Sequence, residues 1–183
     1  MKRFTAMLLA LVMCLSVFGV TASAAESEGP VYETIIGGYD RSNQARASDA
    51  PSNYYNLSAL GNYYKAELID LASQRGSYTK YYFSTGTGKI YMKLHLLRSG
   101  TTTDTNRYLI IYLYEKDNAN AEGTLYDTRT IHYTEADVTK YSSFTGLDPN
   151  KFYYIRFYNN SSSKPKDSMD ISATIEVDDL YRS

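Results

Sequence analysis

The sequence contains no tryptophan and only one cysteine among its 183 residues. That cysteine, Cys14, lies in an apolar N-terminal run that we expect to be removed on export. The remaining chain can then form no internal disulfide, and its stability must come from a hydrophobic core. No later apolar run reaches the roughly 20 residues of a membrane-spanning helix. What remains is about the size of one ordinary domain.

The sequence also lacks an excess of positive or negative charge. The chain has 19 basic and 20 acidic residues, and loss of Lys2 and Arg3 with the N-terminal segment changes its net charge from −1 to −3. Nucleic acids and anionic membranes are bound by strongly basic surfaces. The balance of charge therefore argues against either as the main partner.

The first 25 residues have the three parts of a secretory signal peptide. Lys2 and Arg3 are followed by a nearly unbroken apolar run at 7–20 and by small residues at 21–25,. This pattern predicts cleavage after Ala24 or Ala25 and a secreted, extracellular protein. A membrane anchor is disfavoured because the run is short and ends in a cleavage-like site. A lipoprotein is disfavoured because Met13, and not a small residue, precedes Cys14.

The mature chain divides into a polar segment and a domain. Residues 26–53 are rich in turn-forming residues and show no sustained helical period, which predicts a linker with one short strand at 31–36. The domain is expected to cover residues 54–183. Its C-terminal end carries no sorting signal, so we expect the protein to be released or held at the cell surface non-covalently.

From residue 54 onward the pattern is that of β-strands separated by turns. Apolar and polar residues alternate with a period of two at 89–97, where Ile90, Met92 and Leu94 alternate with Tyr91 and Lys93,. Weaker or similar runs lie at 63–71, 78–84, 108–114, 124–133, 138–144, 151–158 and 171–177, of which 63–71 fits a strand or a short helix. About eight strands without intervening helices predict an all-β fold, an antiparallel β-sandwich in a single domain.

Two segments resemble a known family. Residues 81–92 (YYFSTGTGKIYM) resemble the aromatic strand, small turn and apolar strand of bacterial pre-peptidase C-terminal (PPC) domains, and residues 145–158 (TGLDPNKFYYIRFY) resemble their late aromatic strand. The resemblance covers roughly residues 63–177 and implies a jelly-roll sandwich of a kind appended to secreted enzymes, here standing alone. The family's Asp-x-Asp pair before the aromatic strand is replaced by residues 76–80 (GSYTK), so a calcium role is not carried over.

The sequence shows no catalytic constellation, and we expect no enzyme. His95 and His132 are far apart, and no Gly-x-Ser-x-Gly elbow is present,. Asp178 and Asp179 are adjacent and would point to opposite faces of a strand. Glu135 and Asp137 would share a face with Cα atoms roughly 7 Å apart, but they lie between two strand runs, where a solvated turn is the ordinary state.

One loop offers a possible cation site. Oxygen-bearing side chains crowd residues 115–122, and calcium prefers such ligands. Ala119 and Ala121 interrupt the alternation that a calcium loop would use, so no cofactor is expected and a solvated hairpin loop is the simpler interpretation. The oxygen-bearing residues are Glu115, Asp117, Asn118, Asn120 and Glu122.

Tyrosine is what the chain has in excess, with 20 residues, all after the signal. If Ile90, Leu109, Ile111 and Ile155 face the core, three strands send tyrosines and cations to the opposite face. Flat rings and polar donors hold sugars or peptides, whereas the simpler alternative is a ladder of ring pairs that stabilises the sheet. The predicted binding residues are Tyr91, Tyr108, Tyr112, Tyr114, Tyr154, Arg156 and Tyr158.

These observations predict a secreted, non-catalytic binding module. Its expected partner is an extracellular glycan, a component of the cell envelope or a protein, held on the tyrosine-rich sheet face. The alternative is a structural extracellular protein that assembles a matrix through its sheet edges. Neither hypothesis involves nucleic acid or a membrane span.

Overall fold

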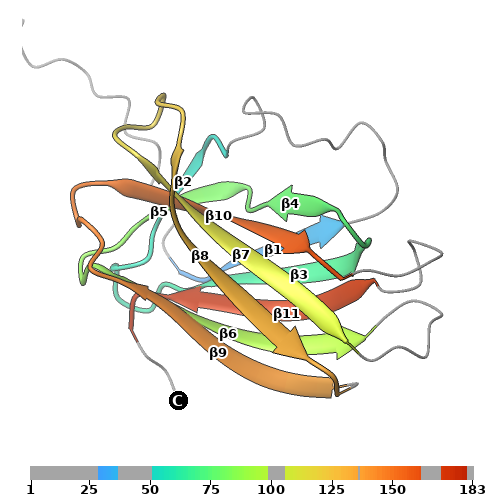
Figure 1. Cartoon of the computed structure of the whole chain (residues 1–183). Coiled ribbons are helices and arrows are strands. Elements are labelled where there is room, and N and C mark those ends of the chain that lie inside the picture. The colour runs from blue at the N-terminus through green and yellow to red at the C-terminus, as the bar shows by residue number, and fades with distance from the viewer. Residues whose placement is uncertain (1–28, 37–50, 99–105, 136, 162–169, 181–183) are drawn as a thin grey trace, which may run out of the picture.

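The structure, a computed structural model, describes residues 29–36, 51–98, 106–135, 137–161 and 170–180. Within these residues it contains eleven β-strands in two packed sheets (Figure 1). No helix of the described residues is long and apolar enough to cross a membrane. The predicted all-β sandwich in a single domain is therefore confirmed.

The two sheets have five and six strands. The five-stranded sheet has the order β1 (Val31–Ile36), β3 (Tyr64–Leu71), β11 (Ile171–Asp178), β6 (Lys89–Arg98) and β9 (Asp137–Thr145). The six-stranded sheet has the order β2 (Asn53–Asn56), β5 (Tyr81–Ser84), β10 (Phe152–Asn159), β7 (Arg107–Lys116) and β8 (Thr124–Tyr133), with β4 (Gly76–Tyr78) also paired to β10.

The strand pairing is that of a jelly roll. The first and last of eight strands pair (β3 with β11), and so do the second and seventh (β5 with β10), the third and sixth (β6 with β9) and the two in the middle (β7 with β8). All four pairs are antiparallel, as expected when one long antiparallel ribbon is rolled into two sheets. β1, β2 and β4 are additions to this frame, and β1 and β2 pair in parallel with β3 and β5.

The strand predicted at 31–36 is present, but it is not part of a linker. β1 is hydrogen-bonded to β3 over its whole length, and Val31 and Ile35 belong to the core. Glu33 on the same strand is buried, which raises the pKa of its carboxyl, and it accepts hydrogen bonds from the Tyr64 hydroxyl and the Lys80 N–H. The sandwich thus includes residues upstream of the boundary expected at 54, and the ambiguous segment at 63–71 is a strand.

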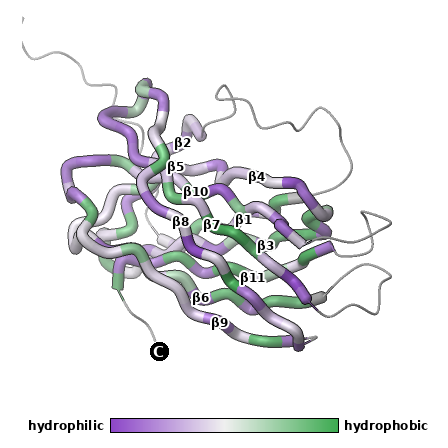
Figure 2. The backbone as a smooth tube through the Cα atoms, in the orientation of Figure 1, coloured by the Kyte–Doolittle hydropathy of each residue, from purple (hydrophilic) through white to green (hydrophobic). Residues whose placement is uncertain are grey.

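The core follows from the period of two that the sequence shows. Ile90, Leu109, Ile111 and Ile155 have no exposed surface, as predicted from the alternation of their strands. Hydrophobic and hydrophilic residues alternate along the strands in Figure 2, which leaves each sheet with one face in the core and one facing outward. The outward faces are where a binding site can be built.

Candidate functional site

The predicted tyrosine face is divided between the two sheets. Tyr91 lies on β6, in the five-stranded sheet, whereas β7 and β10 belong to the six-stranded sheet. The outward side chains of the two sheets point in opposite directions, because the sheets pack face to face. The assignment of Tyr91 to one surface with the other six residues is therefore wrong. A period of two shows which residues share a face of a strand, but not which sheet the strand joins.

The other six residues do lie on one face. Tyr114 and Tyr154 are opposite each other in the β7–β10 register and stack with 5.0 Å between ring centroids. The Arg156 guanidinium lies 5.7 Å from the centroid of Tyr112 and 5.4 Å from that of Tyr158. Tyr108 is set apart along β7 and stacks on His132 of β8, with 4.6 Å between centroids. The rings thus pair across strands, as the ladder interpretation predicts.

Tyr154 is not available as a platform, because it is only 4% exposed. The segment that leads into β8 covers it, and a Cβ placed on Gly123 would lie 2.4 Å from the Tyr154 ring. Burial raises the pKa of the Tyr154 phenol to about 12. Tyr78 of β4 packs against both Tyr154 and Tyr114, with centroids 5.7 and 5.9 Å away. This part of the face is a packed aromatic layer.

The same layer continues to the end of the sheet formed by β2 and β5. Tyr54, Tyr82 and Phe152 contact one another with centroids 5.4–5.7 Å apart. The Lys116 ammonium lies 4.6 Å from the centroid of Tyr82, and partial burial lowers the pKa of that ammonium. Such ring pairs and cation–π contacts stabilise a sheet. The rings on this face are mainly engaged with one another.

The outward face of the five-stranded sheet is hollowed. A hollow of about 210 Å³ is lined by Tyr63, Tyr91 and Tyr141 together with the charged residues Lys93, Glu176 and Asp178. The strand register explains the grouping, because Lys93 on β6 is opposite both Tyr141 on β9 and Glu176 on β11, and Tyr91 is opposite Asp178. The lining residues that one strand contributes are thus two positions apart and point to the same outward face.

Ion pairs join two of the charged side chains of this hollow, Lys93 and Glu176, to each other and to Lys65. The Glu176 carboxylate lies 3.5 Å from the Lys65 ammonium and 3.9 Å from the Lys93 ammonium. All three side chains are partly exposed, so the pairs contribute little to stability. The pairs instead orient the side chains, so that a carboxylate and an ammonium lie next to each other beside the rings.

A second hollow, of about 360 Å³, adjoins the first. It is lined by Tyr32, Thr34, Lys65, Glu67 and Thr174, with Glu33 below. The Tyr32 and Tyr63 hydroxyls are hydrogen-bonded at 2.7 Å, and their rings meet edge to face with centroids 6.2 Å apart. The Lys65–Glu176 pair also joins the two hollows. We call the two hollows together the tyrosine groove, with Tyr32, Tyr63, Tyr91 and Tyr141 as its rings.

Sequence reasoning found one of these four rings, Tyr91. Tyr141 is 53% exposed and Tyr32 is 67% exposed, but β9 alternates weakly and the polar segment around β1 predicts a linker. The pattern of neither strand therefore points to this face. Glu176 and Asp178 carried a clearer signal, because they alternate with the buried Ile175 and Val177. That alternation placed them on the outward face of β11 without showing which strands lie beside it.

The histidine and acidic residues considered for catalysis lie apart in the fold. His95 lies 3.2 Å from Asp137 and 3.3 Å from the Thr139 hydroxyl on the five-stranded sheet, whereas His132 is on β8 of the other sheet. Glu135 is exposed in the turn before β9. Among the described residues, no group of three or more His, Cys, Asp or Glu side chains could hold a metal ion.

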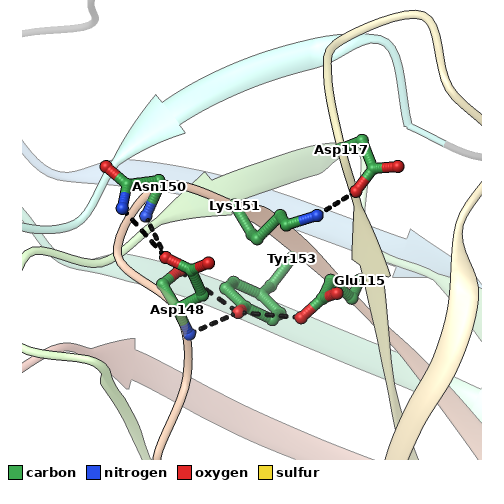
Figure 3. A network of polar contacts seen from close by, with 6 residues as sticks. All are labelled: Glu115, Asp117, Asp148, Asn150, Lys151 and Tyr153. Carbon is green, nitrogen blue, oxygen red and sulfur yellow. Dashed lines mark hydrogen bonds and ion pairs between the residues drawn. The ribbon is translucent and has the colours of Figure 1, made fainter.

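The oxygen-rich loop after β7 is held by protein donors (Figure 3). The Lys151 ammonium is paired with Asp117, and this hydrogen bond raises the pKa of Lys151. The Glu115 carboxylate accepts a hydrogen bond from the Tyr153 hydroxyl at 3.1 Å, and Lys116 donates to the Ala119 carbonyl at 2.8 Å. Protein donors thus engage the Glu115 and Asp117 carboxylates of this loop.

No protein-family model and no curated protein sequence matches the chain. Its fold is similar to that of solved structures, among them a CBM4 structure (TM-score 0.34, 16% identity, 67% of this chain and 70% of that one). Another is a family GH115 4-O-methyl-α-glucuronidase with specificity for decorated arabinogalactans (TM-score 0.38, 11% identity, 64% of this chain). The chain spans only 14% of that enzyme's length. Both likenesses are at low sequence identity and concern the fold alone.

Proposed function

We propose that this protein is a non-catalytic module that binds a glycan of its surroundings, such as a cell-envelope polysaccharide, in the tyrosine groove. The observation that supports this is the gathering of Tyr63, Tyr91 and Tyr141 with Lys93 and Glu176 in one hollow. A tyrosine ring offers a flat apolar surface to the C–H face of a sugar, and its hydroxyl bonds to sugar hydroxyls. The ammonium and carboxylate supply a donor and an acceptor for the remaining hydroxyls.

The shape of the groove favours a chain of sugars over a single one. The two hollows lie side by side across the strands of the five-stranded sheet, from β9 to β1. Neighbouring strands are about 4.8 Å apart, so five strands span roughly 19 Å. That length is several times the width of one sugar ring. The proposed ligand is therefore an extended oligosaccharide that runs across the strands.

The test begins with a glycan array and isolated cell-wall polysaccharides, followed by calorimetry with the best soluble oligosaccharide. Tyr91→Ala is expected to weaken binding about tenfold or more, because loss of one stacked ring removes on the order of 1.4 kcal/mol. Tyr91→Phe should keep most of the affinity, because stacking needs only the ring. Unfolding by urea should show that both variants are folded.

Tyr112→Ala is the matched control, because Tyr112 lies on the outward face of the other sheet. It should leave the affinity unchanged if the groove is the site. The reverse result, in which Tyr112→Ala loses binding and Tyr91→Ala does not, would move the site to the face predicted from the sequence, with Tyr108, Tyr114, Arg156 and Tyr158. Absence of binding to any polysaccharide would overturn the proposed function itself.

We further propose that the protein is secreted after its signal peptide is cleaved behind Ala24 or Ala25, in a segment that lies outside the described residues. The support is the signal-peptide pattern of the sequence alone. N-terminal sequencing of exported protein should therefore begin at Ala25 or Glu26. Exported material that still begins with Met1 would contradict this localisation and leave the groove unaffected.

A further inference from the structure

The outer edge of β8 is a long, exposed edge of the six-stranded sheet. Among the described residues β8 lies at the end of the six-stranded sheet and pairs only with β7. It is ten residues long, contains no proline and is mostly exposed. An edge of this kind can pair with a strand of another chain unless the protein blocks it. Figure 1 shows β8 of one sheet and β9 of the other converging at the end where the chain passes from β8 to β9.

Two side chains block the middle of this edge. The Thr128 N–H donates a hydrogen bond to Asp127 Oδ1 at 2.7 Å, and the Thr128 carbonyl accepts one from Arg129 Nη1 at 3.0 Å. In an antiparallel strand, the N–H and C=O of one residue point to the same side. Both Thr128 groups therefore face away from β7, and neighbouring side chains satisfy them in place of a further strand.

The blocking residues hold each other and are anchored to the opposite sheet. Arg129 Nη1 lies 2.7 Å from Asp127 Oδ2. Arg129 Nε donates to the Ser143 carbonyl of β9 at 3.1 Å, and its guanidinium lies 4.8 Å from the centroid of Phe144. We call Asp127 and Arg129 the edge clip. The anchoring to β9 holds Arg129 at the edge even though its side chain is partly exposed.

The edge that the clip covers fits a second copy of itself. If two β8 strands pair antiparallel about Thr128, each Thr128 exchanges both hydrogen bonds with Thr128 of the other copy. Asp127 then lies opposite Arg129 of the second copy, so no like charges meet across this pairing. The symmetric register about Thr128 makes a second copy of β8 the partner that this edge fits.

We propose that the edge clip keeps the protein from pairing through β8 with a second copy. Without the clip, the Thr128 N–H and C=O lose their side-chain partners. They can then form hydrogen bonds with the backbone of another β8 instead. A guarded edge suits a binding module, whereas an open edge suits a matrix protein. The clip therefore favours the first of the two functions that the sequence leaves open. The proposal is independent of the glycan site, which lies on the other sheet.

The test is sedimentation velocity over a concentration series. The double variant Asp127→Ala/Arg129→Ala should dimerise at least tenfold more tightly than the wild-type chain. The matched control is Asp117→Ala/Lys151→Ala, which removes another exposed ion pair with the same change in charge and should behave as the wild type. Asp127→Ala alone keeps the contacts of Arg129 with β9, and should give a smaller shift in the same direction.

Thr128→Pro, added to the double variant, shows whether β8 is the interface. Proline lacks the N–H that would join the second copy, and it is tolerated at an edge where that N–H faces away from the sheet. Dimerisation should then be lost while the circular dichroism spectrum stays β-rich. The proposal is overturned if folded clip variants, double or single, sediment as the wild type does, or if the proline leaves the dimer intact.

Discussion

Tyr154→Ala is expected to lower the free energy of unfolding by about 3–5 kcal/mol, as much as or more than Ile155→Ala on the core side of the same strand. Tyr154 is 4% exposed and Ile155 is fully buried. The Tyr154 ring is stacked on Tyr114, contacts Tyr78 and is covered by the backbone at Gly123. Its removal would leave a cavity that these neighbours can fill only in part.

Urea unfolding followed by circular dichroism measures this difference. The control is Tyr112→Ala, because Tyr112 has the same outward register but is half-buried, and it should cost less than about 2 kcal/mol. The alternation of β10 alone predicts the opposite order, with Tyr154 and Tyr112 alike and both cheaper than Ile155. If Tyr154→Ala costs no more than Tyr112→Ala, the covering segment does not bury the ring in solution.

Most of the fold could be predicted because its strands alternate clearly. Ile90 and its neighbours on β6, Leu109 on β7 and Ile175 on β11 show the period of two that one buried face imposes. Turn residues between these runs then gave the number of strands in the jelly-roll frame. β1 was harder to place, since a six-residue strand in a polar segment does not show that it will pair in parallel with β3.

The candidate site is harder to predict from the sequence than the fold, for a physical reason. A strand's own pattern records whether a side chain faces the core, but the neighbour across the sheet depends on long-range pairing. Tyr91 is predicted because its strand alternates clearly, yet Tyr141 and Asp178, which line the same hollow, come from strands about 50 and 87 positions later in the chain,. The burial of Tyr154 was hidden as well, because a loop residue without a side chain, Gly123, covers it.

Gly88→Ala should lower the free energy of unfolding by about 2–4 kcal/mol. Gly88 ends the turn between β5 and β6 with a φ of +66°, and a Cβ there would lie 2.8 Å from the Leu147 carbonyl oxygen. That oxygen belongs to the backbone of the turn between β9 and β10. The Leu147 N–H also donates to the Gly88 carbonyl at 3.0 Å, so the two turns are fixed against each other and cannot separate cheaply.

Gly146→Ala separates the two causes of this loss. Gly146 has a φ of +75° in the neighbouring turn, but nothing lies within 4 Å of the position of its Cβ. Its replacement should cost only the left-handed backbone penalty of about 1–2 kcal/mol. The difference between the two urea midpoints then measures the contact between the turns. Equal losses would mean that the turn at Leu147 moves aside, and that these two connections between the sheets are joined less rigidly than their hydrogen bond indicates.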